Sequence, residues 1–150
     1  MARVLASIVV PGTPAEAEDL WYDRRRWPAF VDGLAHVVKL EGDWPHPGAE
    51  LTWQSRPGGR GRVRERVTAY APRIGQAVQI EDETMTGTQE VAFAPEGQAD
   101  TRVTLTLDFE TKRRSPLGPL TGFFVRRSLT DSLQRTLRRF LAEREGDLRL

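Results

Sequence analysis

Between residues 36 and 111 the sequence is a succession of short segments in which apolar and polar residues alternate, separated by turn-forming residues. Alternation with a period of two is typical of strands that bury one face. The predicted strands are residues 36–41, 49–55, 61–70, 76–82, 86–94 and 101–111. Short connections rich in glycine and proline join neighbouring antiparallel strands. This part of the chain therefore predicts an antiparallel meander with one apolar face to cover.

A further strand and two helices are predicted before the meander. Residues 2–10 are rich in β-branched types, which favour a strand. The segment 13–16, Thr-Pro-Ala-Glu, combines a helix cap, a proline at the first helical position and a glutamate three residues after the cap. It predicts a helix that runs to about Arg24. Pro28 opens a second short helix, which ends before Gly33.

A long amphipathic helix is predicted over residues 118–145, ending near Gly146. Its apolar stripe consists of Leu129, Leu133, Leu137, Phe140 and Leu141, and Leu120 and Phe124 extend it upstream. It is the one predicted element large enough to cover the sheet, and a strongly twisted sheet wraps around such a helix. The expected class is α+β, a helix-grip fold with seven curved antiparallel strands in the order β-α-α-β-β-β-β-β-β-α. Since one helix leaves part of the concave face uncovered, we expect a hollow of the kind that binds small molecules.

The composition narrows the classes of partner. With 150 residues, 39% of them hydrophobic, the chain is expected to form one domain over residues 1–150. A net charge of +1 argues against nucleic acid as a partner. The absence of cysteine and the presence of only two histidines predict no metal site and no cofactor. No apolar run reaches the roughly 20 residues of a membrane span and no signal peptide is recognised, so a cytoplasmic protein is expected.

The order of elements and five short segments resemble the START/Bet v 1-like (SRPBCC) superfamily, and within it the bacterial polyketide cyclase/dehydrase and lipid-transport group. These segments are Thr13–Glu16, Leu20–Trp21, Trp27–Phe30, Gly48–Leu51 and Gly61–Val67. The resemblance covers nearly the whole chain and implies a helix-grip fold around a hydrophobic ligand cavity. Members include carriers, cyclases and hydrolases and share no universal catalytic motif, so no catalytic residue is carried over.

The strand at 61–70 places a carboxyl group among apolar residues. Alternation puts Glu65 on the same face as Val63, Val67 and Ala69. The opposite face carries Arg62, Arg64, Arg66, Thr68 and Tyr70. Because three arginines favour solvent, Glu65 is predicted to face the hollow, where its pKa would rise and it could act as an acid, a base or a ligand anchor. The alternative is that Glu65 lies near a strand end or binds an arginine of the closing helix.

Ten further residues complete the predicted ligand-binding set. Gln89 faces inward with Val91 unless a bulge at Gly87 reverses the strand. Asp82, close to a turn, is expected to be solvated. The predicted lining is Trp53, Glu65, Val67, Ile80, Gln89, Val91, Leu105, Leu107, Phe124, Leu129 and Leu133.

Three functions follow from these patterns. The first is binding, as a carrier or a sensor, of a hydrophobic or aromatic small molecule in the hollow. The second is a cyclase/aromatase- or dehydratase-type enzyme in which Glu65 moves a proton. The third is a protein-interaction module that uses the last helix. The sequence does not decide whether the protein is an enzyme. It is equally compatible with a monomer and with a homodimer.

Charge is unevenly distributed along the chain. Residues 111–150 carry ten basic and four acidic side chains, whereas residues 1–110 carry an acidic excess of five. One interpretation is transient contact with an anionic membrane surface or an acidic partner. The other is a solvated helix face with Arg127–Asp131 and Asp131–Arg135 pairs.

Overall fold

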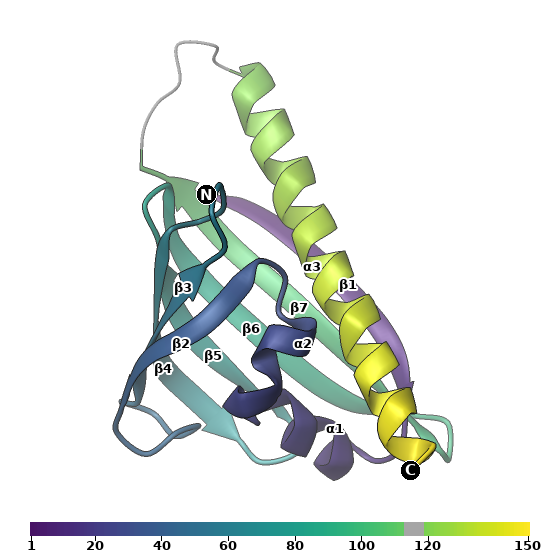
Figure 1. Cartoon of the computed structure of the whole chain (residues 1–150). Coiled ribbons are helices and arrows are strands. Elements are labelled where there is room, and N and C mark those ends of the chain that lie inside the picture. Colours follow the sequence, from purple (N-terminus) through teal and green to yellow (C-terminus); the bar gives the residue numbers. More distant parts are fainter. Residues whose placement is uncertain (113–118) are drawn as a thin grey trace.

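The computed structural model describes residues 1–112 and 119–150 and contains seven strands and three α-helices (Figure 1). The strands are β1 (Ala2–Pro11), β2 (Leu34–Glu41), β3 (Glu50–Ser55), β4 (Arg62–Ala71), β5 (Gly75–Glu81), β6 (Met85–Glu96) and β7 (Asp100–Thr111). The helices are α1 (Pro14–Trp21), α2 (Trp27–Phe30) and α3 (Pro119–Leu148), with a 3₁₀ turn, η1, at Arg24–Arg26.

All seven strands form one antiparallel sheet in the order β1-β7-β6-β5-β4-β3-β2. Strands β2 to β7 follow chain order, and β1 joins the far edge beside β7. Figure 1 shows the sheet curling so that β2 and β3 turn toward α3, which crosses the concave side. The predicted α+β helix-grip architecture and its order of elements are confirmed.

The N-terminal helices start where the sequence predicts, but the first ends early. The Thr13 hydroxyl accepts from the Glu16 amide and the Glu16 carboxylate accepts from the Thr13 amide, both at 3.2 Å. Helix α1 ends at Trp21 rather than near Arg24. The reason is Asp23, whose side chain accepts from the Arg25 amide and so caps a separate turn.

Strand β4 contains a bulge that the alternation could not reveal. The pairing register with β5 shifts between Val67 and Ala69, and one extra residue reverses the face of those that follow. Tyr70 therefore turns inward, with its ring centroid 5.7 Å from that of Tyr22, and Ala69 turns outward. The predicted faces of these two residues are wrong, whereas the face of Glu65 is unaffected.

Helix α3 packs mainly on β1 and α2, and its second half is the part most firmly held. There Leu137 and Phe140 are fully buried. Arg26 of η1 forms ion pairs with Glu143 and Asp147, both at 2.7 Å. The helix continues to Leu148, beyond the predicted end at Gly146, and the predicted start at residue 118 lies outside the described residues.

Candidate functional site

A cavity of about 50 Å³ lies between the sheet, the α1–α2 region and the middle of α3. All four tryptophans of the chain line it: Trp21, Trp27, Trp44 and Trp53. The remaining wall consists of Val31, Asp32, Arg60, Glu65, Gln76, Val78, Ile80, Gln89, Val91, Leu105, Ser132, Leu133 and Thr136. Aromatic and aliphatic walls with a few polar groups are typical of sites for small organic molecules.

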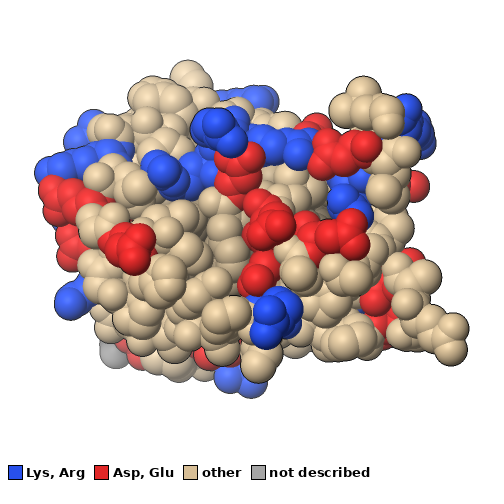
Figure 2. All heavy atoms as spheres, turned by 90° about the horizontal axis from the view of Figure 1, so that it is seen from below, with Lys and Arg blue, Asp and Glu red and all other residues tan. Residues whose placement is uncertain are grey.

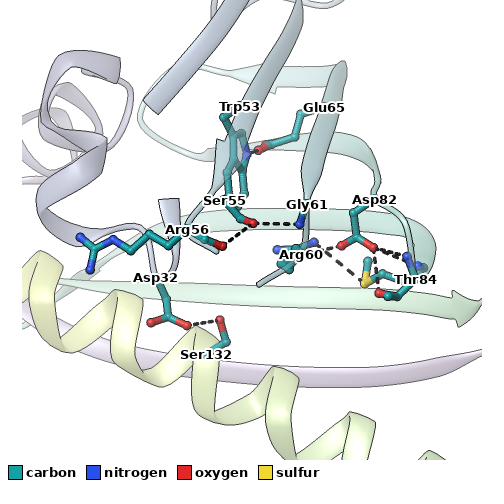
Figure 3. A network of polar contacts seen from close by, with 11 residues as sticks. Asp32, Trp53, Ser55, Arg56, Arg60, Gly61, Glu65, Asp82, Thr84 and Ser132 are labelled. Atoms are coloured by element: carbon teal, nitrogen blue, oxygen red, sulfur yellow. Dashed lines mark hydrogen bonds and ion pairs between the residues drawn. The ribbon is translucent and has the colours of Figure 1, made fainter. Parts of the chain in front are cut away.

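Glu65 is held in this wall by the neighbouring strand. The indole nitrogen of Trp53 on β3 donates a hydrogen bond of 2.7 Å to Oε2 of Glu65 on β4 (Figure 3). Burial raises the pKa of the Glu65 carboxyl, while the Trp53 hydrogen bond and the charge of Arg60 act against that rise. The partner of Glu65 is thus an indole in mid-sheet and not an arginine of the last helix.

Arg60 and Asp82 form a polar rim above the indole. The Arg60 guanidinium carbon lies 5.7 Å from the centroid of the Trp53 ring, within cation–π range. Its Nε donates to Oδ2 of Asp82 at 2.7 Å, and the other oxygen of Asp82 accepts from the amides of Thr84 and Met85 (Figure 3).

The expectation that Asp82 is solvated is wrong: the residue is only 3% exposed. Its carboxylate lies inside the turn, where it satisfies two backbone amides that would otherwise need another acceptor. Burial works against the charge of Asp82, but the hydrogen bonds from Arg60 and Thr84 outweigh it and hold its pKa below the ordinary value.

Asp32 joins the cavity wall to α3. Its Oδ2 accepts from the Ser132 hydroxyl at 2.7 Å (Figure 3), and its backbone amide donates to the Thr136 hydroxyl at 2.9 Å. Arg135 and Arg139 bind the same carboxylate, each within 3.1 Å. These contacts close the wall between α2 and the middle of the last helix.

Seven of the eleven predicted ligand-binding residues line the cavity. They are Trp53, Glu65, Ile80, Gln89, Val91, Leu105 and Leu133. Gln89 faces inward because no bulge interrupts β6 at Gly87. The contact of these residues with a ligand stays a prediction.

The other four predicted residues lie elsewhere. Val67 packs with Ala49 and Val78 in a separate small cluster, and Leu107 is buried in the main core, where side chains fill the space. Leu129 packs at the edge of that core. Phe124 is 64% exposed, since a step of four residues back from Leu129 leads to Val125 rather than to Phe124.

Several cavity residues escaped the sequence analysis. Ser132 and Thr136 are four residues apart and lie beside the apolar stripe of α3. This spacing could have predicted a polar pair on the buried face of the helix. Trp44 and Arg60 lie in connecting segments, whose positions depend on contacts distant in sequence. No local pattern marks them.

The described residues hold no group of three or more histidine, aspartate or glutamate side chains placed to share a metal ion. Within residues 1–112 and 119–150, no helix combines the length and hydropathy needed to cross a membrane.

Solved structures with the same fold cover nearly all of the chain. A START superfamily protein from Mycobacterium smegmatis superposes with a TM-score of 0.78 at 16% identity, covering 96% of this chain and 97% of that one. A protein from Thermus thermophilus gives 0.75 at 20% identity, with 97% and 99% covered. Norcoclaurine synthase from Thalictrum flavum, solved in complex with dopamine and hydroxybenzaldehyde, gives 0.71 at 13% identity, with 95% and 84% covered. At these identities the likeness establishes the fold alone.

The sequence comparison is more specific. None of the curated proteins matches the sequence. The model of a family described as polyketide cyclase / dehydrase and lipid transport matches residues 1–145. With both the sequence and the fold in agreement over nearly its whole length, the chain belongs to the polyketide cyclase/dehydrase and lipid transport family of the START/Bet v 1-like (SRPBCC) superfamily.

Proposed function

We propose that the protein binds a hydrophobic or aromatic small molecule between the sheet and α3, as a carrier or a sensor in the cytoplasm. The observation that carries this proposal is that all four tryptophans line one cavity together with the carboxyl of Glu65, whose pKa is raised by burial. Indole and aliphatic walls would supply affinity by removing apolar ligand surface from water. Glu65, Gln89 and Arg60 would orient the ligand through its polar atoms.

The cavity is too small in this structure for such a ligand. A volume of about 50 Å³ holds a few water molecules, whereas pockets for small organic ligands measure roughly 300–1,000 Å³. Binding therefore requires part of the wall to move outward. The polar contacts that resist this movement are Asp32 with α3 on one side and Arg60 with Asp82 on the other.

Energy transfer from the tryptophans tests the proposal directly. The probe is cis-parinarate, a fluorescent fatty acid that accepts excitation energy from nearby indoles. We expect saturable transfer in the wild type. Val91→Phe, which places a phenyl ring in the cavity, is expected to weaken binding at least ten-fold, and Val38→Phe on the exposed side of β2 is the matched control.

Two results would contradict the proposal. The first is an absence of saturable transfer with cis-parinarate and with an aromatic competitor such as naphthalene. The second is equal affinity in Val91→Phe and the wild type, because a ligand in the cavity could not avoid the added ring.

The raised pKa of Glu65 favours a second function, a cyclase/aromatase- or dehydratase-type enzyme. A carboxyl that stays protonated nearer to neutral pH can give a proton to a substrate oxygen and take one from an adjacent carbon. Turnover of a poly-β-keto thioester that Glu65→Gln abolishes, with cis-parinarate binding retained, would favour the enzyme over the carrier.

A further inference from the structure

Two adjacent aromatic side chains project from the start of α3. Phe123 is 59% exposed and Phe124 64% exposed, and their ring centroids lie 5.7 Å apart. An exposed pair of this size is unusual on a protein that buries its other four phenylalanines, since contiguous apolar surface is normally covered.

The sequence around this pair is basic. Residues 111–130 contain five basic side chains and no acidic one. Arg126 and Arg127 are exposed, and helical spacing places them three and four residues from Phe123, on the same face. Arg127 does not form the predicted ion pair with Asp131. Among the described residues, the arginines of α3 that do form ion pairs lie further along the helix and bind Asp32 and Glu16.

The end of the sheet at which α3 starts is also the end that carries the polar rim of the cavity. Strands β3, β5 and β7 run in the same direction, so the hairpin with Arg60, the turn with Asp82 and the start of α3 share one end (Figure 1). Along the helix, Phe124 and the cavity residue Ser132 are about 12 Å apart, given 1.5 Å per residue.

The opposite end of the molecule has a different character. Figure 2, which views it from below, shows acidic and basic side chains next to one another. There Arg26 pairs with Glu143 and Asp147, and Arg144 pairs with Glu16. Basic side chains that are already paired with carboxylates at this end are less available to an anionic surface.

We propose that the protein docks on anionic phospholipid bilayers through the start of α3. Phe123 and Phe124 would enter the boundary between headgroups and acyl chains, and Arg126 and Arg127 would bind lipid phosphates. The rim of the cavity then faces the bilayer. Docking does not depend on the proposed ligand, whereas the passage of a hydrophobic molecule from bilayer to cavity rests on both proposals.

Vesicle sedimentation tests this docking. The intact protein is mixed with vesicles of phosphatidylcholine alone or of phosphatidylcholine with phosphatidylglycerol. We expect binding to the mixed vesicles that falls at high salt, because the attraction between arginines and phosphates is screened. Phosphatidylcholine vesicles should bind far less protein.

Paired variants separate the two contributions. Phe123→Ser/Phe124→Ser is expected to lower vesicle affinity at least ten-fold, and Arg126→Gln/Arg127→Gln by about five-fold per arginine. Matched controls are Ile74→Ser, which removes an equally exposed apolar residue at the opposite end of the sheet, and Arg138→Gln on α3 itself. Both should bind as the wild type does.

Three outcomes would overturn the proposal: no binding to mixed vesicles, undiminished binding by the phenylalanine variant, or an apolar pair that is buried in a homodimer. The last is recognised by light scattering, as a wild-type dimer that the phenylalanine variant converts to a monomer. The cavity variant Val91→Phe distinguishes the two proposals, because it should no longer bind cis-parinarate but should still bind to vesicles.

Discussion

Glu65 is an acid whose charged form the fold disfavours and whose position the fold nevertheless fixes. Its inward direction could be predicted, because alternation along the strand placed three arginines on the other face. Its partner could not, since the Trp53 indole reaches it across a strand pair whose register depends on the hairpin between them. Phe124 failed for a related reason: it lies next to the apolar stripe of its helix without belonging to it.

The pH dependence of stability should reveal the buried carboxyl. With its pKa raised in the folded state above an unfolded value of about 4.3, Glu65 binds more proton when folded, so its contribution to stability falls as pH rises through that interval. Glu65→Gln has no group that ionises here, so it does not lose stability in this way, and its amide oxygen can still accept the Trp53 hydrogen bond. The stability of the variant relative to the wild type should therefore increase from pH 4 toward neutrality in urea unfolding experiments.

Glu145→Gln, on the exposed side of α3, controls for the removal of a carboxylate that is not enclosed. A stability difference between Glu65→Gln and the wild type that stays constant with pH would contradict the assignment.

At the scale of the element, α3 has two halves of different character. The second half is fixed by buried leucine and phenylalanine side chains and by ion pairs to α1, η1 and the Asp32 loop. The first half is exposed around Phe123 and Phe124. An apolar stripe predicted the helix and the face it buries, but not which half is anchored, because the anchors are long-range pairs between charged side chains that look solvated in the sequence.

The Asp32 carboxylate accepts hydrogen bonds from three side chains of α3, those of Ser132, Arg135 and Arg139. Burial works against its charge, but hydrogen bonds from Arg135 and Ser132 outweigh it and hold its pKa below the ordinary value. Its stabilising effect is therefore present above an unfolded pKa of about 3.9 and lost as pH falls through the folded one. At neutral pH, Asp32→Ala should lower the free energy of unfolding by about 2–3 kcal/mol.

The same change should speed amide hydrogen exchange in the middle of α3, which mass spectrometry can localise. The control is Asp131→Ala, which removes a carboxylate of α3 itself and is expected to change the exchange rate little. Equal exchange in the two variants would mean that Asp32 does not hold the helix.

The strands have their own constraint at Gly87. A Cβ built on this residue would lie 2.1 Å from the carbonyl oxygen of Asp108 on β7, far closer than two such atoms approach. Gly87→Ala should therefore destabilise the protein by about 1–3 kcal/mol or more, measured by urea unfolding. Gly146→Ala is the matched comparison: nothing lies within 4 Å of that site in α3, and alanine there should stabilise by up to about 1 kcal/mol. An unchanged free energy of unfolding in Gly87→Ala would show that β6 and β7 can move apart at this point without a loss of stability.

For the whole molecule, the order of elements, the α+β class and the wrapping of sheet around helix followed from where the apolar period changes from two to 3.6. The size of the cavity did not. It depends on how far Trp21, Trp27 and Trp44 reach into the space between helix and sheet, and those three approach from segments whose placement is tertiary. The sequence therefore predicted seven of the residues that line this cavity, but not that the cavity is as small as about 50 Å³.

The pairing of β1 with β7 has a consequence for biosynthesis. β1 leaves the ribosome before the other six described strands, yet its hydrogen-bonding partner β7 is the last of the seven to be made, so about 90 residues separate the two events. At roughly 5–20 residues per second, the nascent chain carries an unpaired strand for on the order of 5–20 s. The edge of β6 that pairs with β7 stays without its partner for a shorter time. Both β1 and β6 obtain their hydrogen-bonding partner when β7 emerges. Completion of the sheet is thus deferred until β7 has been made, and until then β1 is a segment that chaperones for extended apolar chains can bind.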